Sequence, residues 1–331
     1  MNQILPVHTH HAPSHYHTFG RCRVATMGDP HLGRRFVSGV PLHRRGEREE
    51  SVWRDFRASL TDPTELDVHV CMGDLFDRAV VPYDVVLRAA RAYWQAAEAF
   101  PDRTYVVLKG NHDVGGDLAA TTAFDVFKAL VARKPNIMVV DHQPRGLITA
   151  AGAMLAFCPW DKTDQIEGMG GDAIFGHWDI HDFGSSRNVV PTRAVSGRFP
   201  VAVTGHDHTP QTLERDGVTV IGTGSLQPFT HGEDPHGVLY RTMTLAELLE
   251  LGDGARDLCV RVLLEQGETL PADIDCLQLT AMRRGSEVEA EPVDLAALDI
   301  AALWKDAMAA HGVDDELSGL LFDKYRAREA A

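Results

Sequence analysis

Short apolar runs that end in polar residues recur between residues 22 and 208. Five such runs are followed within two residues by Gly, Asp, Asn or His: Cys22–Met27, Asp67–Met72, Thr104–Leu108, Ala173–Phe175 and Val201–Thr204. Nearly continuous apolar strands of this kind suit a sheet that is covered on both faces. Apolar positions at three-to-four spacing predict helices over Glu47–Leu60, Tyr83–Phe100 and Asp117–Arg133. The pattern predicts a layered α/β domain whose polar residues gather at the carboxyl ends of its strands, where such sheets bind ligands.

The pattern changes after residue 240. Val260–Leu264 and Cys276–Met282 predict a small strand-containing region. Leu295–His311 and Asp314–Arg328 then predict one or two acidic amphipathic helices, after a break near residues 286–292 that is typical of a linker. Leucines on these helices can pack on a partner or, equally well, on the protein's own surface.

The first 19 residues contain five histidines and no periodicity. They predict a flexible head, with an accessory metal-binding tract as the alternative, because His-rich runs chelate metals. The expected organisation has four parts: head 1–19, catalytic domain 20–240, small cap-like region 241–290 and acidic helical tail 291–331.

Composition places the protein among ordinary globular proteins. Apolar residues make up 44% and charged residues 24% of the 331 positions, which excludes wholesale disorder. The longest apolar stretch, Ile148 to Trp160, is too short to span a bilayer, and no secretory signal pattern begins the chain. Five scattered cysteines without CxxC spacing predict reduced thiols. We therefore expect a cytoplasmic protein that does not enter a membrane.

The net charge of −15 argues against a protein that merely coats nucleic acid. The charge is nevertheless uneven, because residues 1–60 are net positive and residues 286–331 are net negative. The arginines between Arg34 and Arg48 could follow a phosphate backbone, and a solvated basic loop explains them equally well.

The strand ends carry a set of metal-binding side chains. They are Asp29, His31, Asp74, Asn111, His112, His177, His206 and His208, with no cysteine among them. Carboxylate, amide and imidazole donors are typical of sites for Mn²⁺, Fe or Zn²⁺, whereas structural zinc sites are built from thiolates. Residues two apart on an extended strand end point to the same side, so Asp29 with His31 and His206 with His208 each offer a pair of donors. Of the neighbours Asn111 and His112, which diverge, only one is expected to be a ligand. The set then contains seven ligands. This is more than one tetrahedral ion can bind, but it suits two ions that share a carboxylate.

The ordered set of segments resembles the signature of the calcineurin-like metallophosphoesterases over roughly residues 20–240. That signature reads D-x-H, G-D-x-x-D-R, G-N-H-[DE], a His and G-H-x-H, and here it stands as Asp29–His31, Gly73–Arg78, Gly110–Asp113, His177 and Gly205–His208. The resemblance implies a layered α/β sandwich of two mixed β-sheets flanked by helices. A small C-terminal α+β region and terminal helices would follow it.

The resemblance also implies ligands for two divalent ions, with Mn²⁺ favoured and Fe or Zn²⁺ as alternatives. It assigns Asp29, His31 and His208 to the first ion, Asn111, His177 and His206 to the second, and Asp74 to both. His181 competes with His177 for its place, and His177 is preferred because it follows Gly176 at a strand end.

Three further side chains receive roles from the same resemblance. His112 would stay off the metal ions and protonate the leaving oxygen or stabilise the transition state. The carboxylate of Asp77 would orient His112, and Arg78 would clamp a phosphate group through its planar donors.

Asp29–Gly33 and the segment Gly222–Glu233 resemble the SbcD-type nuclease subunit of bacterial and phage repair complexes. This resemblance implies a DNA exonuclease or endonuclease, 3′-to-5′ if an exonuclease, that acts in repair or recombination with an SbcC-like ATPase and possibly as a homodimer. The head has no counterpart in that family, and region 241–290 is short for its cap. The alternatives are a small-molecule or nucleotide phosphodiesterase or phosphatase, and a metal-free interaction scaffold.

Overall fold

The computed structural model describes residues 14–117, 120–181, 188–271, 273–283 and 319. The chain divides into two compact units, Met1–Arg283 and Arg284–Ala331, and the elements below all belong to the first. Most of the predicted head (1–13), the predicted linker and the predicted terminal helices lie outside the described residues, apart from the single position 319.

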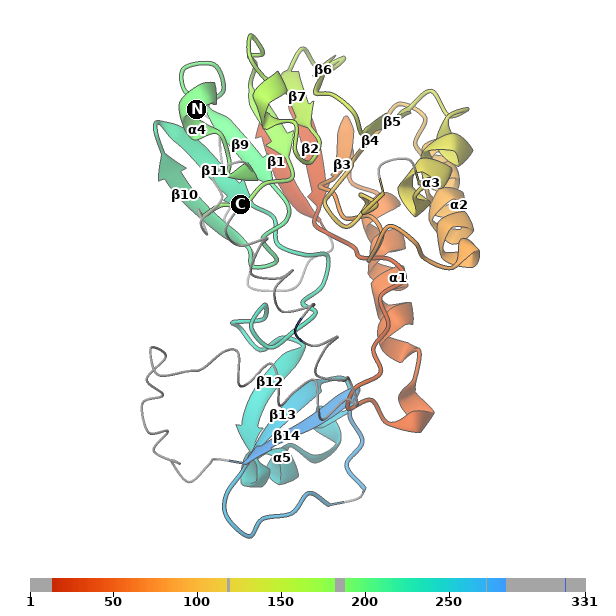
Figure 1. The fold of residues 1–331 in the computed structure, drawn as a ribbon, viewed down its shortest axis with the longest axis vertical. Helices are drawn as coiled ribbons and strands as arrows, with labels where there is room; N and C mark the ends of the chain where they lie inside the picture. Colours follow the sequence, from red (N-terminus) through yellow and green to blue (C-terminus); the bar gives the residue numbers. More distant parts are fainter. Residues whose placement is uncertain (1–13, 118–119, 182–187, 272, 284–318, 320–331) are drawn as a thin grey trace. The chain divides into compact units, whose positions relative to one another are not determined.

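Two mixed β-sheets form the centre of the first unit (Figure 1). One has the order β1 (His15–Phe19), β2 (Cys22–Met27), β3 (Val68–Cys71), β4 (Thr104–Leu108) and β5 (Ile137–Val140), and only β1 in it is antiparallel to its neighbour. The other has the order β10 (Gln211–Arg215), β11 (Val218–Gly222), β9 (Val201–Thr204), β8 (Ala173–Gly176), β7 (Met154–Cys158) and β6 (Arg145–Ile148). Its four central strands are parallel, and a hairpin strand closes each edge.

Apolar side chains from both sheets form one core between them. Val70 and Val106 from the first sheet and Phe157 and Phe175 from the second are completely buried. The two phenylalanine rings stack with their centroids 5.2 Å apart. Burial of each such side chain contributes about 1.5–3 kcal/mol, so this layer fixes the two sheets against each other and aligns their strand ends.

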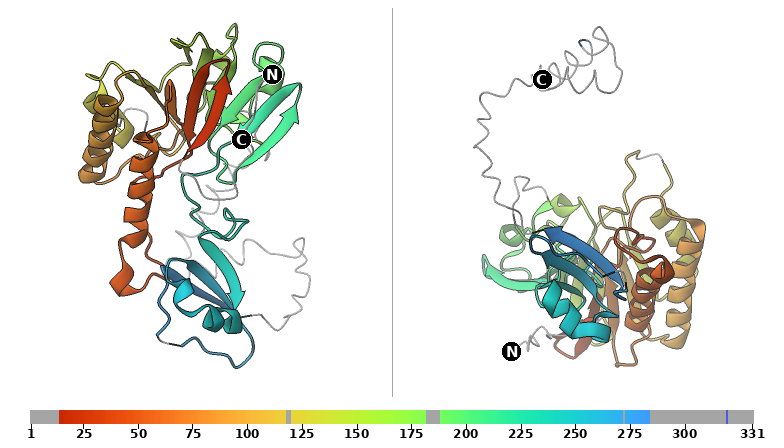
Figure 2. Two further views of the ribbon diagram at one scale, coloured as in Figure 1. Left: turned by 180° about the vertical axis from the view of Figure 1, so that it is seen from behind. Right: turned by 90° about the horizontal axis from the view of Figure 1, so that it is seen from below.

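Three helices cover the other face of the first sheet (Figures 1 and 2). They are α1 (Glu47–Leu60), α2 (Tyr83–Ala99) and α3 (Ala123–Val131). The prediction began the third helix at Asp117, and that start is wrong by six residues. The side chains of Thr122 and Asp125 form a reciprocal capping box, which satisfies the first free N–H groups and starts the helix at Ala123.

A small parallel sheet, β12 (Tyr240–Thr244), β13 (Cys259–Leu264) and β14 (Gln278–Arg283), follows the sandwich. Helix α5 (Leu245–Leu251) packs on it and begins with its own capping box. The other short helices among the described residues are η1 (Leu42–Arg44), η2 (Thr163–Gln165), α4 (Thr192–Val195) and η4 (Gly252–Ala255). A hydrogen bond of 2.8 Å from the Leu279 N–H to the Gly39 carbonyl ties the small sheet to the loop that precedes α1. The predicted fold class, a layered sandwich with a small α+β region, is confirmed.

The flexible head was predicted to extend to residue 19, yet residues 15–19 form β1 and pair with β2. The residues of this edge strand alternate between half-buried and exposed positions, so the strand contains no apolar run. Its His17 lies 3.0 Å from the Thr26 hydroxyl through Nε2. Among the residues that the structure describes, no helix combines the length and apolar composition that crossing a membrane requires.

We expect buried His69 on β3 to make the fold sensitive to mild acid. Burial and the positive charge of Arg103 lower the pKa of His69 to about 3. The unfolded chain therefore takes up this proton below about pH 6.5 while the folded chain does not, and stability falls as the pH falls. His69 alone should cost about 2 kcal/mol of the free energy of unfolding between pH 7 and pH 5.

Urea unfolding of His69→Gln at pH 7 and pH 5 measures this contribution. The variant should lose about 2 kcal/mol less than the wild type over that interval, whereas His236→Gln, a change at an exposed position, should keep the wild-type loss. An unchanged loss in His69→Gln would contradict the assignment.

Candidate metal centre

Loops at the carboxyl ends of five strands bring the predicted ligands together. The strands are β2, β3, β4, β8 and β9, and their ends lie along one edge of the sandwich. Three overlapping groups have donor atoms within 4.8 Å of one another: Asp29 with His31 and His208, His31 with Asp74 and His112, and Asp74 with His177 and His206. Asp74 and His31 each belong to two groups, so the clusters are continuous.

In the first group, donor atoms face one another across a small space. Nε2 of His31 is 3.1 Å from Nε2 of His208, which is 3.8 Å from a carboxylate oxygen of Asp29. The other Asp29 oxygen is buried and has no hydrogen-bond partner among the described residues. An orphaned carboxylate oxygen at full burial is costly unless a cation satisfies it.

In the second group, His177 presents a lone pair to the cluster. Its Nδ1 lies 2.9 Å from the Met72 carbonyl, which can only accept a hydrogen bond, so this nitrogen carries the proton. In the neutral form of the ring Nε2 is an acceptor, and it lies 3.5 Å from an Asp74 oxygen and 2.9 Å from Oδ1 of Asn111. Acceptors that face one another repel unless a proton or a cation lies between them.

The electrostatics of the cluster favour positive charge. Burial alone would lower the pKa of His177, but the negative charges of Asp74 and Asp29 raise it to about 10. Burial raises the pKa of Asp29 to about 6. Together with the orphaned oxygen and the facing acceptors, this donor set fits divalent cations of the Mn²⁺, Fe or Zn²⁺ type.

Three of the predicted ligands have left-handed backbones. The φ angles are +43° at His31, +46° at Asp74 and +74° at His206. Each costs about 1–3 kcal/mol and persists where the surroundings hold it. Here the His31 N–H donates to the Asp74 carbonyl at 3.0 Å, and the His206 N–H donates to the Asp29 carboxylate at 2.8 Å. Asp29 with His31, and His206 with His208, are therefore paired by left-handed turns. The expectation that these pairs lie on extended strand ends is wrong.

Asp113 joins the loop after β4 to the loop after β3, which carries Asp74. It is completely buried and accepts N–H groups from Gly110, Leu75 and Phe76 at 3.0–3.2 Å. Burial and the charge of Asp74 raise the pKa of Asp113 to about 7. The His112 N–H donates in turn to Asp74 at 2.8 Å. The loops after β3 and β4 are thus one bonded unit.

Asp77 contacts His112 differently from the prediction. Nδ1 of the exposed His112 ring is 2.7 Å from the backbone carbonyl of Asp77, and the predicted carboxylate contact is wrong. The carboxylate lies 3.7 Å from Arg34 and 3.2 Å from Arg78, because the guanidinium groups attract it away from the imidazole. Since a carbonyl only accepts, the Nδ1 of His112 carries the proton and Nε2 is its free base. The side chain of Arg78 is 72% exposed and binds Asp77 beside the cluster.

The two histidines that competed for one place are separated in the structure. His177 lies in the cluster, whereas Nε2 of His181 is 3.2 Å from Oε1 of Gln211, a contact on the surface.

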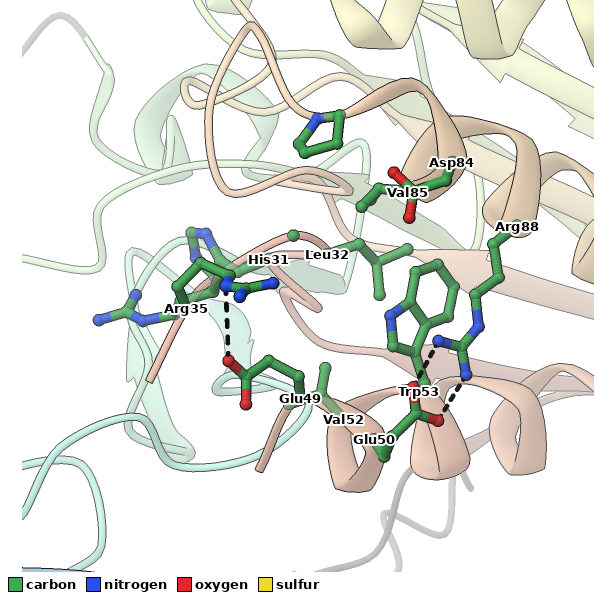
Figure 3. Close-up of a pocket in the computed structure, with 13 residues that line it drawn as sticks. His31, Leu32, Arg35, Glu49, Glu50, Val52, Trp53, Asp84, Val85 and Arg88 are labelled. Carbon is green, nitrogen blue, oxygen red and sulfur yellow. Dashed lines mark hydrogen bonds and ion pairs between the residues drawn. The ribbon is translucent and has the colours of Figure 1, made fainter. Parts of the chain in front are cut away.

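A cavity of about 200 Å³ adjoins His31 between the loop after β2 and helices α1 and α2 (Figure 3). Four of its charged residues form two pairs: Arg88 forms two bonds of 2.7 Å with Glu50, and Arg35 lies 3.7 Å from Glu49. The predicted basic stretch is therefore partly neutralised in the fold.

The sequence profile of the calcineurin-like phosphoesterase family matches residues 22–210, more than half of the chain. The chain belongs to this family. The phosphoesterase is thus a metal-dependent phosphoester hydrolase, and the superfamily inferred from the five segments is confirmed. A search of curated proteins finds no match to it.

Sequence reasoning gave no role to several side chains that line the phosphoesterase site. The Trp160 ring lies 5.0 Å from that of His206, and the Phe229 ring lies 5.3 Å from that of His31. Asp179 and Glu233 contact His206 and His208. Glu233 lies in the Gly222–Glu233 segment that was singled out for its resemblance. No spacing rule, however, connects Asp179 or Glu233 with the histidine that it contacts.

We expect Gly110→Ala to disrupt the cluster. An added Cβ would stand 2.1 Å from a carboxylate oxygen of Asp74 and 2.3 Å from its backbone nitrogen, so the shared carboxylate must move. Such overpacking costs about 1–3 kcal/mol, and Mn²⁺ affinity measured by calorimetry should fall by about 5- to 150-fold, since 1.4 kcal/mol corresponds to a factor of ten. Gly116→Ala, in the same loop with nothing within 4 Å of the added Cβ, is the control. Equal Mn²⁺ affinities in the two variants would contradict this geometry.

Proposed function

We propose that this phosphoesterase is a dinuclear-metal phosphodiesterase that hydrolyses DNA. The position of Asp74 carries the dinuclear part of the proposal. One of its carboxylate oxygens lies 3.7 Å from Nε2 of His31 and 3.5 Å from Nε2 of His177. A carboxylate between two histidines of different groups suits a ligand shared by two ions.

The proposed ligands follow the two groups on either side of Asp74. Asp29, His31 and His208 would hold one ion, and Asn111, His177 and His206 the other. Two divalent ions held there would supply an activated water and neutralise charge on the phosphate group. The metal that serves in the cell is proposed to be Mn²⁺.

The chain's own residues then handle the proton and the leaving group. The Asp77 carbonyl fixes the Nδ1 proton of His112, so Nε2 can hold the proton that the leaving oxygen needs. The predicted ligands Asp29, His31, Asp74 and His177 are buried, whereas His112 is exposed. The exposure of His112 suits contact with substrate. Arg78 and Arg34, on both sides of the Asp77 carboxylate, can contact a phosphate oxygen.

DNA as substrate is supported by resemblance to the SbcD-type nucleases at Asp29–Gly33. The Gly222–Glu233 segment supports it less, because it builds the site itself: the Leu226 N–H donates to the Asp29 carbonyl at 3.0 Å and the Ser225 N–H to the His208 carbonyl at 3.2 Å. A repair or recombination role, an SbcC-like ATPase partner, a homodimer and a cytoplasmic location are proposed on the same resemblance.

A phosphodiesterase for nucleotides or other small esters is the second candidate. The net charge of −15 and the pairing of Arg34 and Arg78 with Asp77 favour it, because both weaken attraction to a polyanion.

Purified protein supplied with Mn²⁺ should cleave duplex or single-stranded DNA as well as bis-p-nitrophenyl phosphate. The assay is repeated with a co-expressed SbcC-like ATPase. Cleavage of the small ester alone under both conditions would reject the nuclease proposal and leave the second candidate.

We expect His112→Ala to retain two bound ions per chain and lose about 10²- to 10⁴-fold in turnover, the usual contribution of a general acid. Asp74→Ala should lose both activity and metal. Metal content by mass spectrometry and turnover of the small ester measure both effects. The role given to His112 would be wrong if its replacement emptied the site, and fewer than one ion in the Mn²⁺-supplied wild type would favour a metal-free scaffold.

A further inference from the structure

The two histidines of the loop after β9 face the cluster with opposite ring nitrogens. His206 places Nδ1 3.0 Å from Oδ1 of Asn111, and its Nε2 points to a different residue, Asp179. His208 does the reverse, since its Nε2 faces His31 and its Nδ1 points to Glu233. In each ring, the nitrogen turned away from the cluster meets a carboxylate.

Asp179 is held in place by backbone pairing. Its carboxylate is 2.9 Å from Nε2 of His206 and its side chain is 23% exposed. Its N–H donates to the Asn188 carbonyl and its carbonyl accepts from Val190, both at 3.0 Å. The next residue, Ile180, donates its N–H to Asp207 at 2.8 Å. The Asp179 segment and the His206 loop are therefore bonded to each other, and the carboxylate has a fixed position.

Glu233 is held by a turn of its own. One carboxylate oxygen is 3.3 Å from Nδ1 of His208, and the other accepts the Phe229 N–H at 2.7 Å. The Glu233 N–H donates to the Thr230 carbonyl at 3.2 Å. The Phe229 ring, carried by this turn, lies 5.7 Å from the ring of His208. The turn thus fixes the angle of His208 by a charge and by a ring contact.

We propose that Asp179 and Glu233 are positioning residues that set the affinities of the two metal ions separately, Asp179 through His206 and Glu233 through His208. The inference rests on the dinuclear site of the proposed function. A carboxylate that accepts the outer N–H of an imidazole fixes the tautomer and directs the inner lone pair at the ion. Because the two carboxylates come from different segments, each ion can be tuned without the other.

The isosteric variants Asp179→Asn and Glu233→Gln test this division. Each should weaken one of the two Mn²⁺ binding steps by about 10- to 100-fold, the usual effect of losing such a partner. The other step should change less than about threefold. Calorimetry gives both affinities, and electron paramagnetic resonance distinguishes one bound Mn²⁺ from a coupled pair. Glu214→Gln, at an exposed position on β10, is the control and should bind as the wild type.

Double variants assign each carboxylate to its histidine. Asp179→Asn should have no further effect on Mn²⁺ binding in a His206→Ala background and its full effect in a His208→Ala background, because it acts through His206. Glu233→Gln should show the opposite pattern. A change that only loosened the fold would weaken binding in both backgrounds.

The outcomes separate this inference from the function beneath it. A wild-type protein that binds fewer than two Mn²⁺ ions overturns the dinuclear site and the inference with it. A wild type that binds two, with Asp179→Asn and Glu233→Gln each unchanged or each weakening both steps equally, overturns the inference alone.

Discussion

Three buried carboxylates meet at the ends of adjacent strands, and their mutual repulsion is the constraint on which this structure depends. Asp29, Asp74 and Asp113 are each at most 1% exposed. Burial of unpaired negative charge costs several kcal/mol per group, and placing such groups side by side adds to that cost. The N–H groups directed at Asp29, Asp74 and Asp113 offset part of it. The remainder calls for positive charge at the centre of the cluster.

The sandwich supplies the rigidity that this arrangement needs. Left-handed turns at His31, Asp74 and His206 store conformational strain, and the closed core between the two sheets holds the strand ends that carry them. Close approach also limits the side chains allowed, as the space around Gly110 shows. The apolar layers therefore stabilise the fold, while the strained and charged residues at the strand ends destabilise it, as expected for a site that binds charged groups.

Sequence patterns predicted the parts of this protein that depend on local order. Apolar runs located β2, β4 and β9 to the residue, and the order of the polar segments grouped the side chains that meet in space. Patterns failed where tertiary contacts decide. The edge strand β1 has no apolar run, and the Asp77 carboxylate turns to Arg34 and Arg78 because the loop after β2 brings Arg34 close to it.

Charge at the site also orders the events that hydrolysis requires. The carboxylates of Asp29, Asp74, Asp77, Asp179 and Glu233 surround the cluster, and the guanidinium groups of Arg34 and Arg78 are paired with Asp77. An anionic phosphoester that approached these side chains alone would be repelled. Cations held by the cluster would remove this repulsion, and the Asp77 carboxylate would then compete with the phosphate for the same two guanidinium groups. The acidic side chains at the site would therefore repel the substrate only while the cluster holds no cations.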